Sequence, residues 1–498
     1  MAASLWPPAP QAATNALGVF EGQSDVGSVS PPGAARFDPA SGTYTLDAAG
    51  ANTWYHVDGF HFVWKKAAGD IALTAHIVFP PRTNAREPNP HRKGILMIRQ
   101  SLDAGSAYVG AALHGSGLTA LQFRAARGAN TEGIELNIDA PQTLRIEKRG
   151  DTFTLWLSLH GEPLHPVGAS TLLHLQAPFY VGVGAVSHEV DLTERVNFSQ
   201  LALQVLAPQR ANAKSTLFSA LRSIEIEDQF RRAMVIRSVP ALLESPNWIP
   251  EGKDIFVHEP GRVVGIPLLD PPAGGEPESL ATPGLVDCAP NYGVSFDGKW
   301  LAMSCAAAPG AQHEVFVLPR TGGIPQQLTH GGSSSYFHAW SFDGTTIAFT
   351  RGRASQADIF LVPAAGGAET QLTRDALNDG PDFTPDGKFI YFDSVRSGSL
   401  QIWRMRPDGS APEQITDDEC LNSSPHVAPD GKTLAFLSQP AGAGEAIGPA
   451  AIKVMGFNDG LIRSVAAIRG NRNSFSMYSW GDLKHLAFVS YQSIGDAP

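Results

Sequence analysis

The sequence predicts an all-β protein with two units: an N-terminal β-sandwich of the jelly-roll type, then a six-bladed β-propeller closed by pairing of its two ends. Two observations carry this prediction. Six copies of a strand–turn–strand pattern fill the second half of the chain, about 45 residues apart, which is the spacing of one repeat per propeller blade. The first half lacks this repeat and shows many short strand-like runs with few helix signals, a pattern typical of a sandwich.

Alternation along the chain identifies the strands of the first unit, which is predicted over residues 1–205. In the stretch TFTLWLSLHG, Phe153, Leu155 and Leu157 fall on one face of a strand, because successive side chains point to opposite sides of a sheet. The polar stretch 206–214 is the expected linker, and the propeller is predicted over residues 215–498.

Each propeller repeat is centred on an acidic turn, most often Asp-Gly, between two β-rich runs. Glycine adopts the positive φ that a tight hairpin needs, so Asp-Gly is a strong hairpin signal. Four strand-like runs per copy match one blade, but the last copy ends after two of them. Residues 216–238 are expected to supply the missing strands, which would leave no free sheet edge. The turn acids are Glu251, Asp297, Asp343, Asp386, Asp430 and Asp482.

Both halves resemble known families. The SFDG, TPDG and APDG turns, the aromatic-rich strand after them and the QLT or QIT strand resemble the WD-like repeats of TolB-type six-bladed propellers, over about residues 215–498. The succession RKGILMIRQSL, HGSGLTALQFR and YVGVGAVSHE resembles a concanavalin-like jelly-roll domain, over about residues 18–204. Lectins and glucanases share the jelly-roll fold, so this resemblance implies contact with carbohydrate.

Composition excludes several classes of partner. The formal net charge is -11 and no basic block occurs, so neither nucleic acid nor an anionic membrane is an expected partner. No apolar stretch approaches the ~20 residues that span a bilayer, and membrane insertion is not expected.

Three cysteines, odd in number and unclustered, argue against a disulfide framework. We expect them to be small buried apolar residues. The N-terminus lacks the basic and apolar regions of a signal peptide. The expected location is therefore the cytoplasm, or the periplasm or exterior if the chain is a processed form.

Polar residues that recur on predicted strands of the first unit suggest a ligand-binding groove. Gln122 and Arg124 are two positions apart and share a face, and Trp54 and Trp64 could offer flat surfaces to sugar rings. The alternative is a solvated sheet face with internal ion pairs and core tryptophans. Histidines together with a glutamate also permit a metal site. The expected groove residues are Trp54, Trp64, Arg99, His114, Gln122, Arg124, His188 and Glu189.

Residues just before each acidic turn should lie near the mouth of the propeller funnel and are the second candidate site. The alternative is a water-filled channel lined by polar groups. His338, His426 and Asp379, with Asp382, could surround a divalent cation, and no other cofactor is expected. The candidates are Glu244, Asn247, Asn291, Tyr292, Tyr336, His338, Asn378, Asp379, Asp382, Asn422, His426, Arg472 and Asn473.

Two function classes remain open. The first is a binding protein, with a glycan-binding sandwich and a propeller that docks a saccharide or a protein partner. The second is a carbohydrate-active enzyme, a metal-dependent polysaccharide or oligosaccharide lyase or a glycoside hydrolase, with its site in the funnel. No G-x-S-x-G, P-loop or Rossmann motif occurs, and the absence of a tight catalytic constellation favours the binding protein.

Overall fold

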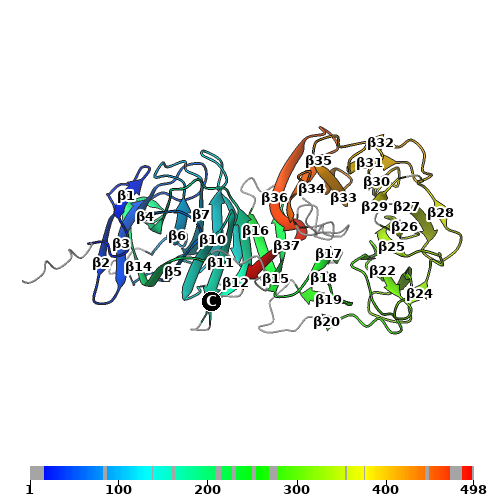
Figure 1. Ribbon diagram of the computed structural model, residues 1–498, viewed down its shortest axis with the longest axis horizontal. Helices are drawn as coiled ribbons and strands as arrows, with labels where there is room; N and C mark the ends of the chain where they lie inside the picture. Colours follow the sequence, from blue (N-terminus) through cyan, green and yellow to red (C-terminus); the bar gives the residue numbers. More distant parts are fainter. Residues whose placement is uncertain are drawn as a thin grey trace, which may run out of the picture. The chain divides into compact units, whose positions relative to one another are not determined.

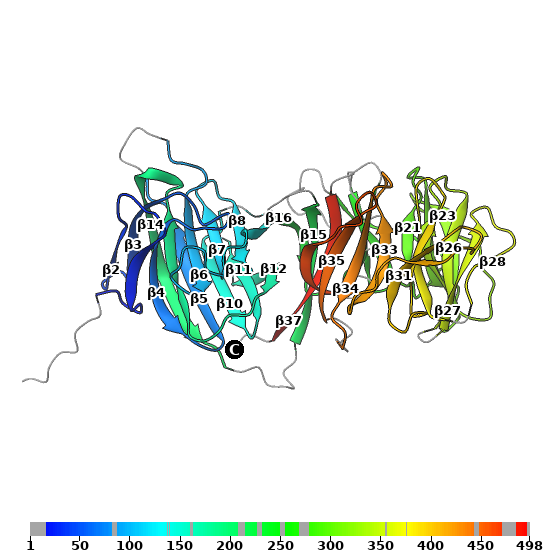
Figure 2. The same ribbon diagram turned by 90° about the horizontal axis from the view of Figure 1, so that it is seen from above.

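The structure is a computed structural model, which describes residues 16–81, 87–136, 138, 140–159, 163–207, 215–226, 232–249, 254–267, 278–353, 356–374, 376–442, 448–470 and 485–495. These residues form two compact units, Met1–Pro208 and Gln209–Pro498. The predicted all-β class is confirmed, with large sheets first and a propeller after them (Figures 1 and 2). Within the described ranges, no helix is long and apolar enough to cross a bilayer.

The first unit consists of two antiparallel sheets. Their strand orders are β1-β4-β13-β6-β7-β8-β9 and β12-β11-β10-β5-β14-β3-β2. The first sheet comprises β1 (Gly22–Val26), β4 (Phe60–Ala67), β6 (Lys93–Arg99), β7 (Tyr108–His114), β8 (Thr119–Arg124), β9 (Glu132–Leu136) and β13 (Phe179–Val186). The second comprises β2 (Ala34–Asp38), β3 (Thr43–Gly50), β5 (Ile71–Val78), β10 (Thr143–Arg149), β11 (Thr152–Ser158), β12 (His165–Leu172) and β14 (Glu189–Val205).

The two sheets pack face to face. Phe153, Leu155 and Leu157 on β11 are fully buried, as their alternation predicts. Gly94 on β6 lies so near the other sheet that a Cβ there would come within 2.6 Å of Ile77. The inner face of β6 is therefore the one that carries Gly94, and the alternate residues from Lys93 to Arg99 point outward.

The second unit contains five four-stranded antiparallel blades among the described residues, each in chain order. Figure 1 shows these blades arranged around a common centre. They are β17 (Glu244–Trp248), β18 (Asp254–Glu259), β19 (Arg262–Pro267), β20 (Glu278–Ser279); β21 (Tyr292–Val294), β22 (Trp300–Ala306), β23 (His313–Pro319), β24 (Gln326–Gln327); β25 (Ser335–Trp340), β26 (Thr346–Arg353), β27 (Gln356–Pro363), β28 (Thr370–Gln371); β29 (Asn378–Phe383), β30 (Ile390–Ser394), β31 (Gln401–Met405), β32 (Glu413–Gln414); and β33 (Leu421–Val427), β34 (Thr433–Gln439), β35 (Gly448–Gly456), β36 (Ile462–Gly470).

Strands from the two ends of this unit also pair. β15 (Ser215–Glu225) lies between β16 (Arg232–Val239) and β37 (His485–Gly495). β15 and β37 are antiparallel along their whole length, from Ser215 opposite Gly495 to Glu225 opposite His485. The sequence predicted that the segment before the first repeat pairs with the last repeat, and this pairing is present. The total of six blades stays a prediction, because residues 471–484 lie outside the described part of the chain.

The acidic turns of the repeat form as predicted where they are described. Asp297 accepts hydrogen bonds from the Ser295 hydroxyl (2.6 Å) and the Lys299 amide (3.1 Å), and Gly298 has a φ of +71°. The Ser295 bond contributes most to lowering the pKa of Asp297 to about 2. Equivalent turns surround Asp343 and Asp386. The predicted turn acids Glu251 and Asp482 lie outside the described residues.

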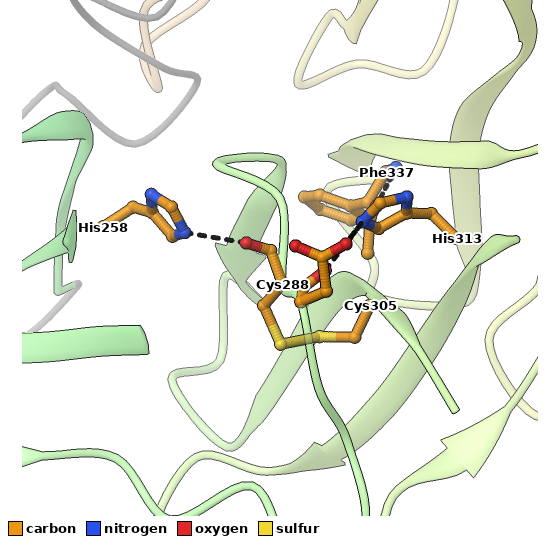
Figure 3. The surroundings of a disulfide bond; sticks show 7 residues. His258, Cys288, Cys305, His313 and Phe337 are labelled. Atoms are coloured by element: carbon orange, nitrogen blue, oxygen red, sulfur yellow. Dashed lines mark hydrogen bonds and ion pairs between the residues drawn. A yellow bond between two sulfur atoms is a disulfide. The ribbon is translucent and has the colours of Figure 1, made fainter. Parts of the chain in front are cut away.

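The prediction of three unpaired and buried cysteines is wrong, because Cys288 and Cys305 are buried but paired, and Cys420 is unpaired but half-buried. Cys288 and Cys305 form a disulfide (Figure 3), and Cys420 is free. The chain before β21 turns back along β22, where Val286 bridges to Ala306, so two cysteines 17 residues apart meet side by side. Spacing along the sequence does not reveal such an antiparallel return.

Thiol titration tests this pairing. Protein purified without reductant and then denatured should react at one cysteine, Cys420, and at three cysteines after reduction. Three reactive thiols before reduction would contradict the disulfide.

Candidate functional site

The outward face of the first sheet brings the predicted polar residues together. Lys93 lies opposite His114 in the β6–β7 register, and Tyr108 lies opposite Arg124 in the β7–β8 register. Gln122 shares this face with Arg124, as their spacing predicts. The residues between these polar positions include Ile95 and Met97, which pack in a buried hydrophobic cluster. Polar groups therefore gather at two places on the face.

The first place is a buried ion triad centred on Asp58. Its carboxylate binds Arg124 through two bonds, of 2.7 and 3.1 Å, and Arg99 at 3.2 Å. All three side chains have no exposed surface. Arg99 also donates to the Asp103 carbonyl (2.6 Å), and Arg124 to the Ser106 carbonyl (3.0 Å).

The triad places Arg99 and Arg124 differently from the prediction of an open groove. Both guanidinium groups are buried and bond to Asp58 and to backbone carbonyls, so they form internal ion pairs, which was the alternative to an open groove. Sequence spacing put them on the right face, but it could not show that residues 52–58 cover that face.

Arg124→Ala should lower the free energy of unfolding by about 3–5 kcal/mol, because it leaves a buried carboxylate short of a partner. Chemical denaturation measures this change. Arg127→Ala is the matched control, since Arg127 also pairs with an aspartate, Asp103, but is 78% exposed, and stability should barely change there. An equally small effect at Arg124 would contradict the burial of the triad.

The second place is the Lys93 cluster, which we define as Asn52, Trp54, His91, Lys93, His114, Gln122 and His188. Lys93 Nζ donates to Asn52 Oδ1 at 2.8 Å and to Gln122 Oε1 at 3.4 Å. It also lies 5.5 Å from the centre of the Trp54 ring, within cation–π range. Lys93 is only 2% exposed, and this burial lowers the pKa of its ammonium group to about 7, with the charge of Asp58 acting in the opposite direction.

His114 carries a buried hydrogen-bond donor. Gln122 accepts from Lys93 through its oxygen, so its amide nitrogen faces His114 Nε2 at 3.2 Å. This assignment makes His114 Nε2 an acceptor and puts the ring proton on Nδ1. Burial, then the nearby charge of Lys93, lowers the pKa of His114 to about 2, so the ring is neutral. Among the described residues, Nδ1 is buried and has no hydrogen-bond partner.

The cluster opens toward solvent through its other rings. His91 is exposed, and Trp54 and His188 are half-buried. The His91 ring lies 6.0 Å from the His114 ring and 5.4 Å from the His188 ring, between centroids. His114 also lines a pocket of ≈ 330 Å³ together with Arg92 and Gln142. Exposure therefore increases from the base of the cluster to its mouth.

Four predicted groove residues belong to this cluster: Trp54, His114, Gln122 and His188. Glu189 follows His188 in the chain and is half-buried. Trp64 lies apart from the cluster, where its indole nitrogen donates to Ser24 Oγ (3.2 Å) and its ring meets Tyr180 edge-on. Sequence reasoning missed Lys93, although its alternation with Arg99 along β6 was a usable signal. His91 and Asn52 are loop residues and carried no signal.

In the propeller, two histidine–aspartate pairs join neighbouring blades. His338 Nε2 on β25 lies 2.9 Å from Asp379 Oδ1 on β29, and the Thr350 hydroxyl contacts both. His426 Nδ1 on β33 lies 3.7 Å from Asp382 Oδ2 on β29. Burial raises the pKa of Asp382, and hydrogen bonding to His426 opposes this. Over the described ranges, no group of three or more His, Cys, Asp or Glu side chains is arranged to hold a metal ion.

Most other predicted funnel residues hold the scaffold. Asn247, Tyr292 and Asn422 are buried, and the Tyr292 hydroxyl donates to the Ser245 carbonyl of the preceding blade at 2.8 Å. Two further residues are bonded within a blade: the Ser394 hydroxyl donates to Asn378, and Glu244 lies 3.8 Å from His258. Tyr336 is half-buried, and its ring packs near His313 of the preceding blade. Asn291 is half-buried. Arg472 and Asn473 lie outside the described residues.

Comparison with known proteins points to one family. A family model described as the TolB β-propeller domain matches residues 338–455. The uncharacterized protein Atu1656 of Agrobacterium fabrum is 34% identical over 274 residues, which cover 54% of this chain and 92% of that protein. A solved "putative TolB" from Agrobacterium tumefaciens is 32% identical, with 55% of this chain and 99% of that chain covered and a TM-score of 0.52. TolB from Acinetobacter baumannii is 13% identical, with 66% and 79% covered and a TM-score of 0.40.

Proposed function

The chain belongs to the TolB-like β-propeller family, and from that premise we propose that it is a saccharide-binding protein. In this proposal the sandwich recognises the saccharide, and the propeller docks a protein or a second saccharide. A propeller fold by itself does not determine an activity, so the proposal depends on the site in the sandwich.

One observation carries the proposal: the Lys93 cluster combines buried hydrogen-bonding groups with an aromatic ring at its mouth. Lys93, Gln122 and His114 form a linked chain of hydrogen bonds at the base. Trp54 is half-buried above Lys93. Sites with a few placed polar groups beside an aromatic surface are typical of ligand recognition, and sugars present both hydroxyl groups and an apolar ring face.

A closed ring would make the propeller a rigid scaffold for docking. We infer that β16, β15 and β37 belong to a sixth blade that closes this ring. Two contacts support this inference. Leu221 and Tyr491 pack with Leu243 and Ile255 of the first blade, whereas Ile224 and other residues of this sheet pack with the β33–β36 blade. The Tyr491 hydroxyl also donates to the Leu243 carbonyl (2.8 Å).

A carbohydrate-active enzyme is the second candidate function. The observation that favours it is the His338–Asp379 pair, in which a carboxylate holds the imidazole at 2.9 Å while both side chains stay partly exposed. Such a pair could remove a proton from a bound sugar. Measured turnover of an oligosaccharide that is lost in His338→Ala would favour this candidate.

The disulfide between Cys288 and Cys305 suggests the compartment in which the protein works. Structural disulfides persist in oxidising compartments and are rare in the cytosol of mesophiles. We therefore propose that the protein works in the periplasm or outside the cell, in place of the cytoplasmic location that the N-terminal sequence suggested.

Glycan-array binding of the full-length protein tests the proposed function. Trp54→Ala should weaken retention of the bound saccharide by about tenfold or more, since it removes the aromatic surface. Trp64→Ala is the control, because Trp64 is also half-buried but lies away from the cluster, and retention should change little. A wild-type protein that retains no glycan would contradict the proposal.

Leu221→Ala tests ring closure. Leu221 is fully buried in the contact with the first blade, so the substitution should cost about 2–5 kcal/mol of unfolding free energy. Leu461→Ala, at a residue 69% exposed, should leave the melting temperature nearly unchanged. If the two variants melt alike, the β16–β15–β37 sheet does not close the ring.

A further inference from the structure

The Lys93 cluster offers hydrogen-bond donors and positive charge without an acid of its own. Asp58 is the acid whose charge acts on Lys93 among the described residues, and its carboxylate already binds Arg99 and Arg124. Arg92, beside the cluster, is paired with Glu194 at 2.6 Å. No other ion pair joins a cluster residue to an acid within the described ranges.

The donors of the cluster exceed its acceptors. An ammonium group has three N–H donors, and two of them, on Lys93, go to Asn52 and Gln122. The Nδ1 donor of His114 is buried without a partner among the described residues. Buried donors in proteins are nearly always satisfied, so a ligand group that fits here accepts hydrogen bonds.

We propose that the Lys93 cluster binds the anionic group of an acidic saccharide, a uronate carboxylate or a sulfate ester. This inference rests on the proposed function and names the class of its ligand. The oxyanion accepts from His114 Nδ1 and from the remaining N–H of Lys93, while the sugar ring lies toward Trp54. A neutral sugar would bring no counter-charge to the buried ammonium group.

Binding of an anion then couples to a proton on Lys93. The pKa of the free ammonium group is about 7, and an adjacent anion raises it. Below pH 7 Lys93 is protonated with and without ligand, so affinity is constant. Above pH 7 the free site loses its proton, and affinity falls by up to about tenfold per pH unit. Among the described residues, the charge of Asp58 acts on Lys93, the charge of Lys93 acts on His114 and His188, and His91 lies against these two rings. Burial lowers the pKa of His114 and of His188, so above pH 7 neither ring carries the charge.

Titration calorimetry on the full-length protein tests the inference with three probes of matched length: an oligouronide, a sulfated oligosaccharide and a neutral oligosaccharide. One acidic probe should bind at least about tenfold more tightly than the neutral one. Lys93→Met should remove this preference, and Lys65→Met, at a lysine that is 42% exposed, should keep it. At pH 8 the wild-type protein should take up a proton on binding, seen by comparing buffers of different ionisation enthalpy, a readout that needs no variant.

The outcomes separate the two proposals. Equal binding of acidic and neutral probes would overturn the anion inference and leave saccharide binding standing. An acidic preference without proton uptake, unchanged in a folded Lys93→Met variant, would place the anion elsewhere and also overturn it. No binding of any saccharide would overturn the proposed function itself.

Discussion

The buried contact between Asp58 and two arginines determines the shape of the candidate site. Bringing three charges out of water is costly, and their mutual attraction roughly offsets that cost. The contact fixes the position of Asp58 against β6 and β8, and it thereby also fixes the residues that precede Asp58 in the chain. Those residues include Asn52, which accepts from Lys93, and Trp54, whose ring lies over it. The Tyr108 hydroxyl, which donates to the Thr53 carbonyl, holds the segment at β7. The Lys93 cluster is thus assembled from a sheet and from a segment pinned onto it.

The propeller shows a different use of polar contacts. Side chains of the inner strands reach back to the preceding blade: Trp340 donates to the Gly293 carbonyl and Tyr292 to the Ser245 carbonyl. Each bond contributes modestly, but repetition around the unit keeps neighbouring blades in register. The histidine–aspartate pairs, His338 with Asp379 and His426 with Asp382, join blades in the same way. Much of the polarity of the predicted funnel therefore holds neighbouring blades together.

The fold was largely predictable because its signals are local. The hairpins at Asp297, Asp343 and Asp386 could be predicted because their turns depend only on adjacent residues. The strand that carries Phe153, Leu155 and Leu157 could be predicted because burial of one face requires an apolar residue at every second position. Contacts between distant segments were not predictable. The Cys288–Cys305 disulfide depends on a chain reversal. From the sequence alone, Arg124 is predicted to be a solvent-facing strand residue. In the fold, Asp58, which is 66 positions away in the chain, binds and covers it. His91 and Asn52 lie in loops, where no periodicity indicates direction.

Hydrogen exchange of Asp58→Asn most directly tests the claim that Asp58 positions the site. The substitution keeps the size of the side chain and removes the charge that holds the two arginines. We expect the amides of residues 52–58 to exchange faster while those of β6, β7 and β8 keep their protection, and Asp103→Asn, at a partly exposed acid, to leave both regions unchanged. Unaltered exchange in residues 52–58 of a folded Asp58→Asn protein would show that the segment holds its place without the triad, and would contradict this account.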